Sequence, residues 1–410
     1  MKNIDFVLSY LFNGNTRSVK DNGNWKELLF FTGFIIYLAR GVWATTMFPF
    51  PRIISKLCFG LAILFIGLKI LLYDRYPYRR LICIGIMALD SLLVIYSSHY
   101  LNIFFWVLLI LGAKDISFKK ILQIYLIITI SIMALAFIAS MTGVIENLKY
   151  VTDDRGVRQA FGCVYTTDFS SHIFYIALVI FYLKGNRLHW FHYVALIVVA
   201  GLVYHFCNTR LDCISMVLTA LLFGIGNYIT QSIQKPTAFS LLWNKLWSFA
   251  SPWIMPAFAA LSFFATLSYN NGESAFWSKV NMLVTARLSL GIIGIKNYGF
   301  TLFGQKIDMI GAGGTTIFPD NYFFIDCSYI LVCLRYGVIA LLLLLIVYSL
   351  SCIKNKKDIY FLYAITLVSI NCVIAHHILE LEYNPFALAL LSQCVHPPVA
   401  DNFSYSKQHV

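Results

Sequence analysis

Arginines in polar stretches between long apolar runs are the first residues of this chain that could do chemistry. Arg155 and Arg158 lie in "TDDRGVRQAFG", Arg210 in "NTRLD" and Arg287 in "ARLSLG". A guanidinium group presents a planar fork of N–H donors that matches phosphate oxygens two at a time. Taken singly, each is equally well explained by a lipid headgroup contact or a local ion pair. Together, from separate loops, they predict a pyrophosphate site.

A second group of residues could move a proton. In "HHILELEYNPF", Glu380 follows His376 by four positions and His377 by three, so that on a helix either histidine could share a face with the carboxylate. A histidine held by a carboxylate suits a general base, and His377 oriented by Glu380 is the first candidate. His376 and Asp320 are the substitutes. A polar cap at the membrane interface and a metal site lacking a fourth ligand are the alternatives.

The composition is that of a protein that crosses a membrane many times. Hydrophobic residues make up 59% of the 410 residues and charged residues only 12%. A span needs about 20 mostly apolar residues, and lipid-exposed backbone must be helical to pair its polar groups. We therefore predict an all-α, polytopic membrane protein of about 12 helices (11–13) in a single transmembrane domain, 1–410. The predicted spans are 28–47, 53–72, 81–97, 100–113, 121–142, 169–183, 189–206, 213–233, 248–268, 327–350, 359–378 and 384–396, of which the fourth and the last are short and could be re-entrant or tilted.

Charge sets the predicted orientation. Much of the net charge of +12 falls in alternate short loops such as "DRYPYRR" and "KNKKD", and basic residues favour the cytoplasmic side. Both termini are then cytoplasmic, and the loops 143–168 and 269–326 face outward with the arginines. The longer loop has apolar residues at helical spacing in "SKVNMLVTARLSLGIIGIKNYG", which predicts an amphipathic helix at the interface. The charge is explained by topology, so no nucleic-acid partner is expected.

Other polar groups inside the predicted spans are interpreted structurally. Arg40 and Asp90 could pair across helices or line a substrate groove. The cysteines lie mainly inside predicted spans and are interpreted as small residues of the membrane core. Cys207 and Cys213 are the one pair that could form a disulfide. Arg335 lies within a span and must face protein or a water-filled cavity. Neither a P-loop nor a GxGxxG motif occurs, so no nucleotide cofactor is expected.

Seven segments in a fixed order resemble the Wzy-type polymerases of bacterial surface polysaccharides. They are "RGVRQAFG" at 155–162, "NTR" at 208–210, "ARLSLG" at 286–291, "YGFTLFGQKI" at 298–307, "DNYFF" at 320–324, "LRYGVIA" at 334–340 and the pattern H-x2-E-x-E-x2-PF at 377–386. The family is similar to O-antigen ligases and shares their C-type glycosyltransferase architecture. The likeness begins near residue 114, and the spaced Arg-to-Gly pattern of the family is matched only loosely by "RLSLGIIGIKNYG".

The resemblance implies an enzyme of the bacterial cytoplasmic membrane whose active site faces outward. It would join undecaprenyl-pyrophosphate-linked oligosaccharide repeat units into capsule, exopolysaccharide or O-antigen without metal, nucleotide or other cofactor, alongside membrane lipid, a flippase and a chain-length regulator. Arg210 and Arg287, then Arg158 and Arg335, would bind the pyrophosphate. The catalytic residues would be His377, Glu380 and Asp320. Tyr322, Tyr298 and Tyr383 would line the sugar path. A ligase and a polysaccharide transporter or flippase remain the alternatives.

Overall fold

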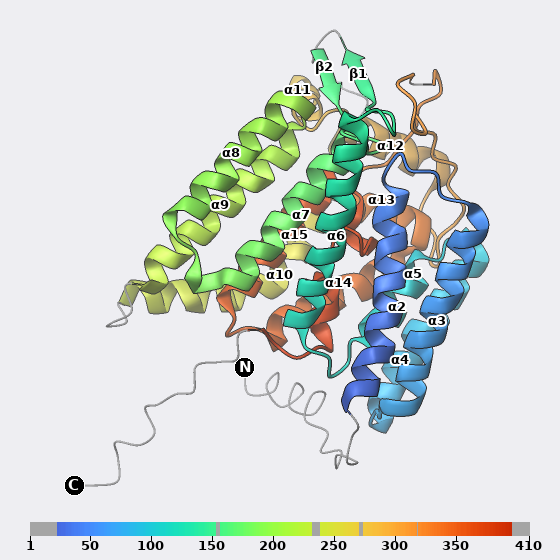
Figure 1. Cartoon of the computed structure of the whole chain (residues 1–410), viewed down its shortest axis with the longest axis vertical. Helices are drawn as coiled ribbons and strands as arrows, with labels where there is room; N and C mark the ends of the chain where they lie inside the picture. The colour runs from blue at the N-terminus through green and yellow to red at the C-terminus, as the bar shows by residue number, and fades with distance from the viewer. Residues whose placement is uncertain (1–22, 153–155, 232–237, 270–273, 318, 396–410) are drawn as a thin grey trace.

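The computed structural model describes residues 23–152, 156–231, 238–269, 274–317 and 319–395. Most of these residues form helices that run along one another in a bundle (Figure 1). Within the described residues, eight helices are long and apolar enough to cross a membrane, and a ninth is added if the bent pair α11–α12 counts as one span. The predicted all-α, multi-pass membrane architecture is therefore confirmed, while the predicted number of about 12 spans stays a prediction.

The helices begin and end close to the edges of the apolar runs. The first half of the chain comprises α2 (Gly23–Ala44), α3 (Arg52–Tyr73), α4 (Tyr78–Ser98), α5 (Asn102–Gly112), α6 (Phe118–Met141), β1 (Lys149–Thr152), β2 (Gly156–Gln159), α7 (Thr166–Lys184), η1 (Gly185–Arg187), α8 (Trp190–Cys207) and α9 (Arg210–Gln231). The second half comprises α10 (Ala238–Ser268), α11 (Ala275–Leu283), α12 (Arg287–Tyr298), α13 (Ser328–Tyr336), α14 (Val338–Lys354), α15 (Ile359–Ile374), η3 (His377–Leu379) and η4 (Phe386–Leu390).

Local chemistry sets several of these boundaries. Pro51 and Pro77 immediately precede α3 and α4, as expected for a residue with fixed φ and no N–H to contribute. The side chain of Ser117 accepts from the backbone N–H of Lys120 at the start of α6. Asp358 does the same for α15, so that the first orphan donors of both helices are satisfied.

The predicted span 327–350 is broken in two at Gly337. This residue has φ of +96°, and a Cβ built on it would lie 2.3 Å from the carbonyl oxygen of Leu302. The backbone N–H of Val338 donates to the carbonyl of Thr301, so the segment "FTLFG" lies against the start of α14. Only glycine fits such a close approach in this conformation, and the single long helix of the prediction is wrong for that reason.

The predicted last span, 384–396, is wrong. Its described residues form the short η4 and irregular backbone, and the preceding residues from 375 onward are also largely non-helical. Buried backbone of this kind needs polar partners inside the protein. The ammonium group of Lys354 donates to the carbonyls of Ala389 and Leu390 at 3.1 and 3.0 Å, and the Tyr125 hydroxyl donates to the carbonyl of Tyr383 at 2.8 Å. These side chains replace the hydrogen bonds that a helix would have made.

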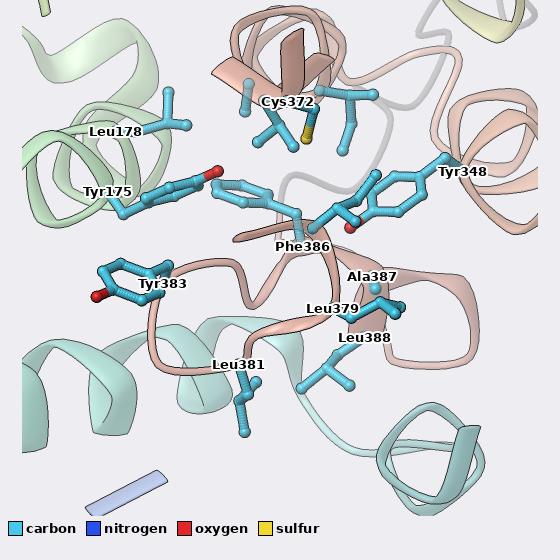
Figure 2. Packing of buried hydrophobic residues seen from close by; sticks show 14 of the residues in the cluster. Tyr175, Leu178, Tyr348, Cys372, Leu379, Leu381, Tyr383, Phe386, Ala387 and Leu388 are labelled. Carbon is cyan, nitrogen blue, oxygen red and sulfur yellow. The ribbon is translucent and has the colours of Figure 1, made fainter. Parts of the chain in front are cut away.

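The irregular segment lies inside the bundle rather than on its surface. Figure 2 shows Leu379, Leu381, Tyr383 and Phe386 extending from it toward the surrounding helices. Phe386 is fully buried and lies 5.8 Å from the ring of Tyr182. Packing of this segment therefore fixes the position of the polar residues just before it, which are those of the candidate site.

The two long loops are partly structured. In 143–168, β1 pairs antiparallel with β2, with Tyr150 opposite Arg158. In 269–326, the expected amphipathic helix is present as two helices, α11 and α12, with a bend of 105° between them. Thr285 and Ala286 at the bend both have positive φ, 54° and 64°. The bend places Arg287 at the first position of α12.

Two pairings that the sequence left open do not form. Cys207 and Cys213 are both free thiols. Arg40 donates from Nε to the hydroxyl of Ser55 at 3.0 Å and lies over the ring of Phe59, whereas Oδ1 of Asp90 is buried with no hydrogen bond to a described residue. The disulfide and the Arg40–Asp90 ion pair are therefore both wrong.

Candidate functional site: two adjoining cavities

Three of the sequence-predicted arginines line one cavity. They come from three separate parts of the chain: Arg158 from β2, Arg210 from the first position of α9 and Arg287 from the first position of α12. His376 and His377, which follow the end of α15, also line this cavity. The remaining lining residues are Thr167, Ser171, Thr209, Leu211, Asp212, Thr285, Asp326, Ile374 and Ala375. We call this space the arginine cavity.

The three guanidinium groups differ in how far they are committed to the protein. Arg158 donates from Nε to the carbonyl of Cys207 at 3.1 Å and from Nη2 to the hydroxyl of Thr166. Arg287 bonds from Nε to the carbonyl of Ile374 at 2.6 Å, and its Nη1 bonds to Val284 and Thr285. Arg210 is exposed, lines the cavity and makes no hydrogen bond or ion pair with the described residues. Its guanidinium donors are therefore available to a ligand.

Helix ends add to the positive potential of the cavity. α9 and α12 begin at Arg210 and Arg287, and Thr167 belongs to the first turn of α7. The first N–H groups of a helix carry the positive end of its dipole, which favours a bound anion. At α12 the side-chain oxygen of Asn281 already accepts from the N–H groups of Leu288 and Ser289, so this helix contributes its dipole and not those donors. Asp212 is a buried acidic residue in the lining of this cavity. Its carboxylate accepts hydrogen bonds from the hydroxyls of Ser170 and Ser171 and from the amide of Asn371 at 3.5 Å. These bonds hold its charge within the protein.

The histidine pair is tied to Glu380, as the spacing predicts. Nδ1 of His377 and Oε2 of Glu380 are 2.7 Å apart, and Nε2 of His376 and Oε1 of Glu380 are 3.7 Å apart. The ring of His377 stacks on Tyr383 with 3.7 Å between centroids, and Tyr383 stacks in turn on His172 at 4.2 Å. His377 is therefore fixed in orientation, with one nitrogen held by a carboxylate and its ring at the arginine cavity.

A second cavity adjoins the first and shares three lining residues with it. Its charged lining is acidic apart from His376, with the carboxylates of Asp168, Asp326, Glu380 and Glu382. Its walls are otherwise Gly41, Ala44 and Thr45 from α2 and its C-terminal end, Val164 and Thr167, and the rings of Tyr165, Tyr322, Phe324 and Tyr383. We call it the acidic cavity. Carboxylates that accept hydrogen bonds from hydroxyl groups, together with flat aromatic faces, are suited to a polyhydroxylated ligand.

Two aromatic residues of the acidic cavity can act as hydrogen-bond donors. Burial and the neighbouring Asp326 raise the pKa of the Tyr322 hydroxyl above its ordinary value, so it stays protonated. The hydroxyl of Tyr383 donates to Asp168 at 3.2 Å. Gly41 lets the wall close, because a Cβ at this position would lie 3.0 Å from the carboxylate of Glu382.

Asp326, His376 and Thr167 line both cavities. Asp326 forms an ion pair with Nη2 of Arg287 at 3.3 Å and lies 4.0 Å from Nδ1 of His376. Glu380 lines only the acidic cavity and His377 only the arginine cavity, so their hydrogen bond also crosses the boundary between the two.

Three predicted site residues lie away from both cavities. The guanidinium of Arg335, on α13, lies over the ring of Tyr100 at 4.1 Å. Asp320 is exposed in a turn, and Tyr298 stacks on Phe323 at the end of α12. None of the three lines either cavity. Arg155 and its proposed ion pairs lie outside the described residues.

Several residues at the cavities were not identified from the sequence. Asp326 lies six positions after Asp320 and immediately before an apolar run; Asp168 lies at the start of another. Each is an isolated acid at the outer edge of a predicted span, and this is the signal that could have found them. Glu382 is the second glutamate of the pattern H-x2-E-x-E-x2-PF at 377–386, and nothing else in the sequence singles it out.

The histidine pair has a second geometric property. Donor atoms of His376, His377 and Glu380 lie within 4.8 Å of one another, a spacing that one metal ion could bridge. The direct 2.7 Å hydrogen bond uses one donor atom of His377 and one of Glu380. A chelator separates the two uses experimentally.

Comparisons of the chain with models of known protein families, with curated proteins and with solved structures find no match. The functional argument therefore rests on the residues and geometry of the two cavities.

Proposed function

We propose that this membrane protein is a glycosyltransferase that transfers an oligosaccharide from a polyprenyl pyrophosphate carrier, undecaprenyl pyrophosphate in bacteria, to a hydroxyl group of another lipid-linked saccharide. Repeated transfer makes it a repeat-unit polymerase acting at the outer face of the cytoplasmic membrane. The observation that supports this most is the meeting of Arg158, Arg210 and Arg287 with the His376–His377 pair at one cavity beside a second, acidic and aromatic one.

The arginine cavity suits the leaving group. When the bond between the anomeric carbon and the phosphate oxygen breaks, the electron pair stays on the pyrophosphate. Fixed cations in a poorly hydrated site stabilise that charge more in the transition state than in the ground state. Arg210 makes no hydrogen bond or ion pair with the described residues, and the starts of α7, α9 and α12 add the positive ends of their dipoles.

The histidine pair suits the attacking group. The acceptor hydroxyl forms the new bond to the anomeric carbon and loses its proton as it does so. His377, held at Nδ1 by Glu380, takes the proton in this proposal, and Glu380 stabilises the resulting imidazolium. His376, which lines both cavities, is the substitute base.

The acidic cavity suits the saccharide. Its carboxylates accept hydrogen bonds from sugar hydroxyls, Tyr322 donates one, and the rings of Tyr165 and Phe324 offer flat apolar faces. Binding of both saccharides near the shared wall would bring the acceptor hydroxyl to the anomeric carbon, which is the positioning that a reaction between two large substrates requires.

The direct test is polymerisation with purified components. The protein in nanodiscs is incubated with an undecaprenyl-pyrophosphate-linked repeat unit from its source strain, without nucleotide and with EDTA, and products are separated on a gel. A ladder of products is expected. A single transfer to a different acceptor would indicate a ligase, and unchanged lipid-linked substrate with folded protein would refute the transferase. Activity that EDTA abolishes and Zn²⁺ restores would instead identify His376, His377 and Glu380 as a metal site.

A further inference from the structure

Arg287 is less available to a ligand than its position at the cavity suggests. A guanidinium group has five N–H donors. The Nε donor of Arg287 is committed to the carbonyl of Ile374, and Nη1 to Val284 and Thr285. The end that remains is Nη2, and it faces the carboxylate of Asp326 at 3.3 Å. An oxyanion that reaches Arg287 must therefore share or replace the bond to Asp326.

We propose that Asp326 is an internal counter-anion, which occupies Arg287 in the empty protein and is displaced when the pyrophosphate of the donor binds. The proposal rests on the phosphate-binding role given to the arginine cavity. It gives a function to Asp326, a residue that the sequence did not identify as part of the site.

The surroundings of Asp326 give the displaced carboxylate a place to go. Its side chain is 26% exposed, more than the 13% of Arg287, so it is not locked in the protein interior. It lies at the boundary of the two cavities, 4.0 Å from Nδ1 of His376. A carboxylate released from Arg287 can therefore turn toward His376 and the acidic cavity, both of which it already adjoins. Displacement therefore requires a side-chain rotation rather than a movement of helices.

The consequence for affinity has a definite sign. If Asp326 only positioned Arg287, removal of its charge would leave the guanidinium less ordered and weaken anion binding. If it competes with the anion, removal of its charge frees Nη2 and strengthens binding. Since the pair is partly exposed to solvent, its strength is modest, and the expected gain is about fivefold.

The test is isothermal titration calorimetry with inorganic pyrophosphate in EDTA, on the full chain in nanodiscs. Asp326→Asn is expected to bind pyrophosphate about fivefold more tightly than the wild type. Asp326→Glu, which keeps the carboxylate, should stay close to the wild type. The matched control is Asp308→Asn: Asp308 lies in the same loop, is 72% exposed and pairs with Lys306 at 3.0 Å, so removal of its charge should leave the affinity unchanged.

The outcomes separate this inference from the proposed function. Wild-type protein that does not bind pyrophosphate refutes the phosphate role of the arginine cavity itself. Binding by the wild type with equal or weaker binding by Asp326→Asn refutes the counter-anion and leaves the cavity's role intact. An equal gain in Asp308→Asn would show a general charge effect and also refute the inference. Asp326→Ser, which likewise lacks the carboxylate, replaces Asp326→Asn if that variant does not fold.

Discussion

Arg210→Ala is the substitution that separates catalysis from stability most cleanly. Because Arg210 makes no hydrogen bond or ion pair with the described residues and is exposed at the cavity, its removal should change the free energy of unfolding by less than about 0.5 kcal/mol. Arg158 and Arg287, by contrast, each hold backbone carbonyls, so their loss would disturb the fold as well.

The expected loss of activity follows from the same geometry. Arg287 is partly neutralised by Asp326 and Arg158 is committed at two nitrogens, so Arg210 supplies the largest share of free donors to the leaving group. Loss of one preorganised donor to a developing charge lowers kcat by about 100- to 1,000-fold. Arg210→Lys keeps the positive charge but not the planar fork of donors, so its kcat should lie between those of the wild type and Arg210→Ala.

The assay is the initial rate of ladder formation from the lipid-linked repeat unit, with thermal unfolding of the same preparations in nanodiscs. Arg187→Ala is the matched control, since Arg187 is also exposed but lies in η1 at the opposite end of α7 from Thr167. A loss smaller than about threefold in Arg210→Ala, or a loss accompanied by unfolding, would refute the reasoning.

Three further outcomes are expected. Glu380→Gln should lower kcat by at least about tenfold, because Glu380 orients His377, and should leave the affinity for inorganic pyrophosphate unchanged, because Glu380 does not line the arginine cavity; weaker pyrophosphate binding with an unchanged kcat would contradict this. Gly337→Ala should destabilise the protein by more than about 1 kcal/mol in thermal unfolding, since its Cβ would meet the Leu302 carbonyl at positive φ, whereas Gly60→Ala, with open space around it, should not. A membrane-impermeant maleimide applied to intact cells should label a cysteine at position 320 and not one at 356; the reverse would overturn the predicted orientation.

The apolar runs predicted the long helices well because lipid leaves the backbone few choices. A segment that faces hydrocarbon must pair its own N–H and C=O groups, and α3, α6 and α8 lie within three residues of their predicted ends. The same reasoning fails for 384–396. That segment is apolar because it is buried in protein, and its backbone is paired by Lys354 and other distant side chains that no local pattern reveals.

The charged residues of the candidate site could be predicted from the sequence where their type or local spacing pointed to them, but not where the fold alone brings them together. Isolated charges between the predicted spans identified Arg158, Arg210 and Arg287, because a charge near a membrane must be paired or must serve a function. The contact between His377 and Glu380 follows from their spacing alone. Asp326 required knowledge of how residues 299–326 return to the end of α15, and this depends on the bend at Thr285 and the close approach at Gly337.

The arrangement of the two cavities explains why so many polar groups converge at helix ends. α7, α9 and α12 begin at the arginine cavity, while α2 ends at the acidic cavity and α15 ends where the two meet. Within a mostly apolar bundle, these helix ends are where charged side chains can face a common space without contacting lipid. Transfer between two lipid-linked saccharides would need one anionic leaving group and one hydroxyl nucleophile held side by side. A cationic cavity and an acidic cavity that share Asp326 and His376 meet that requirement, and their shared wall would be the place where binding of one substrate alters the surroundings of the other.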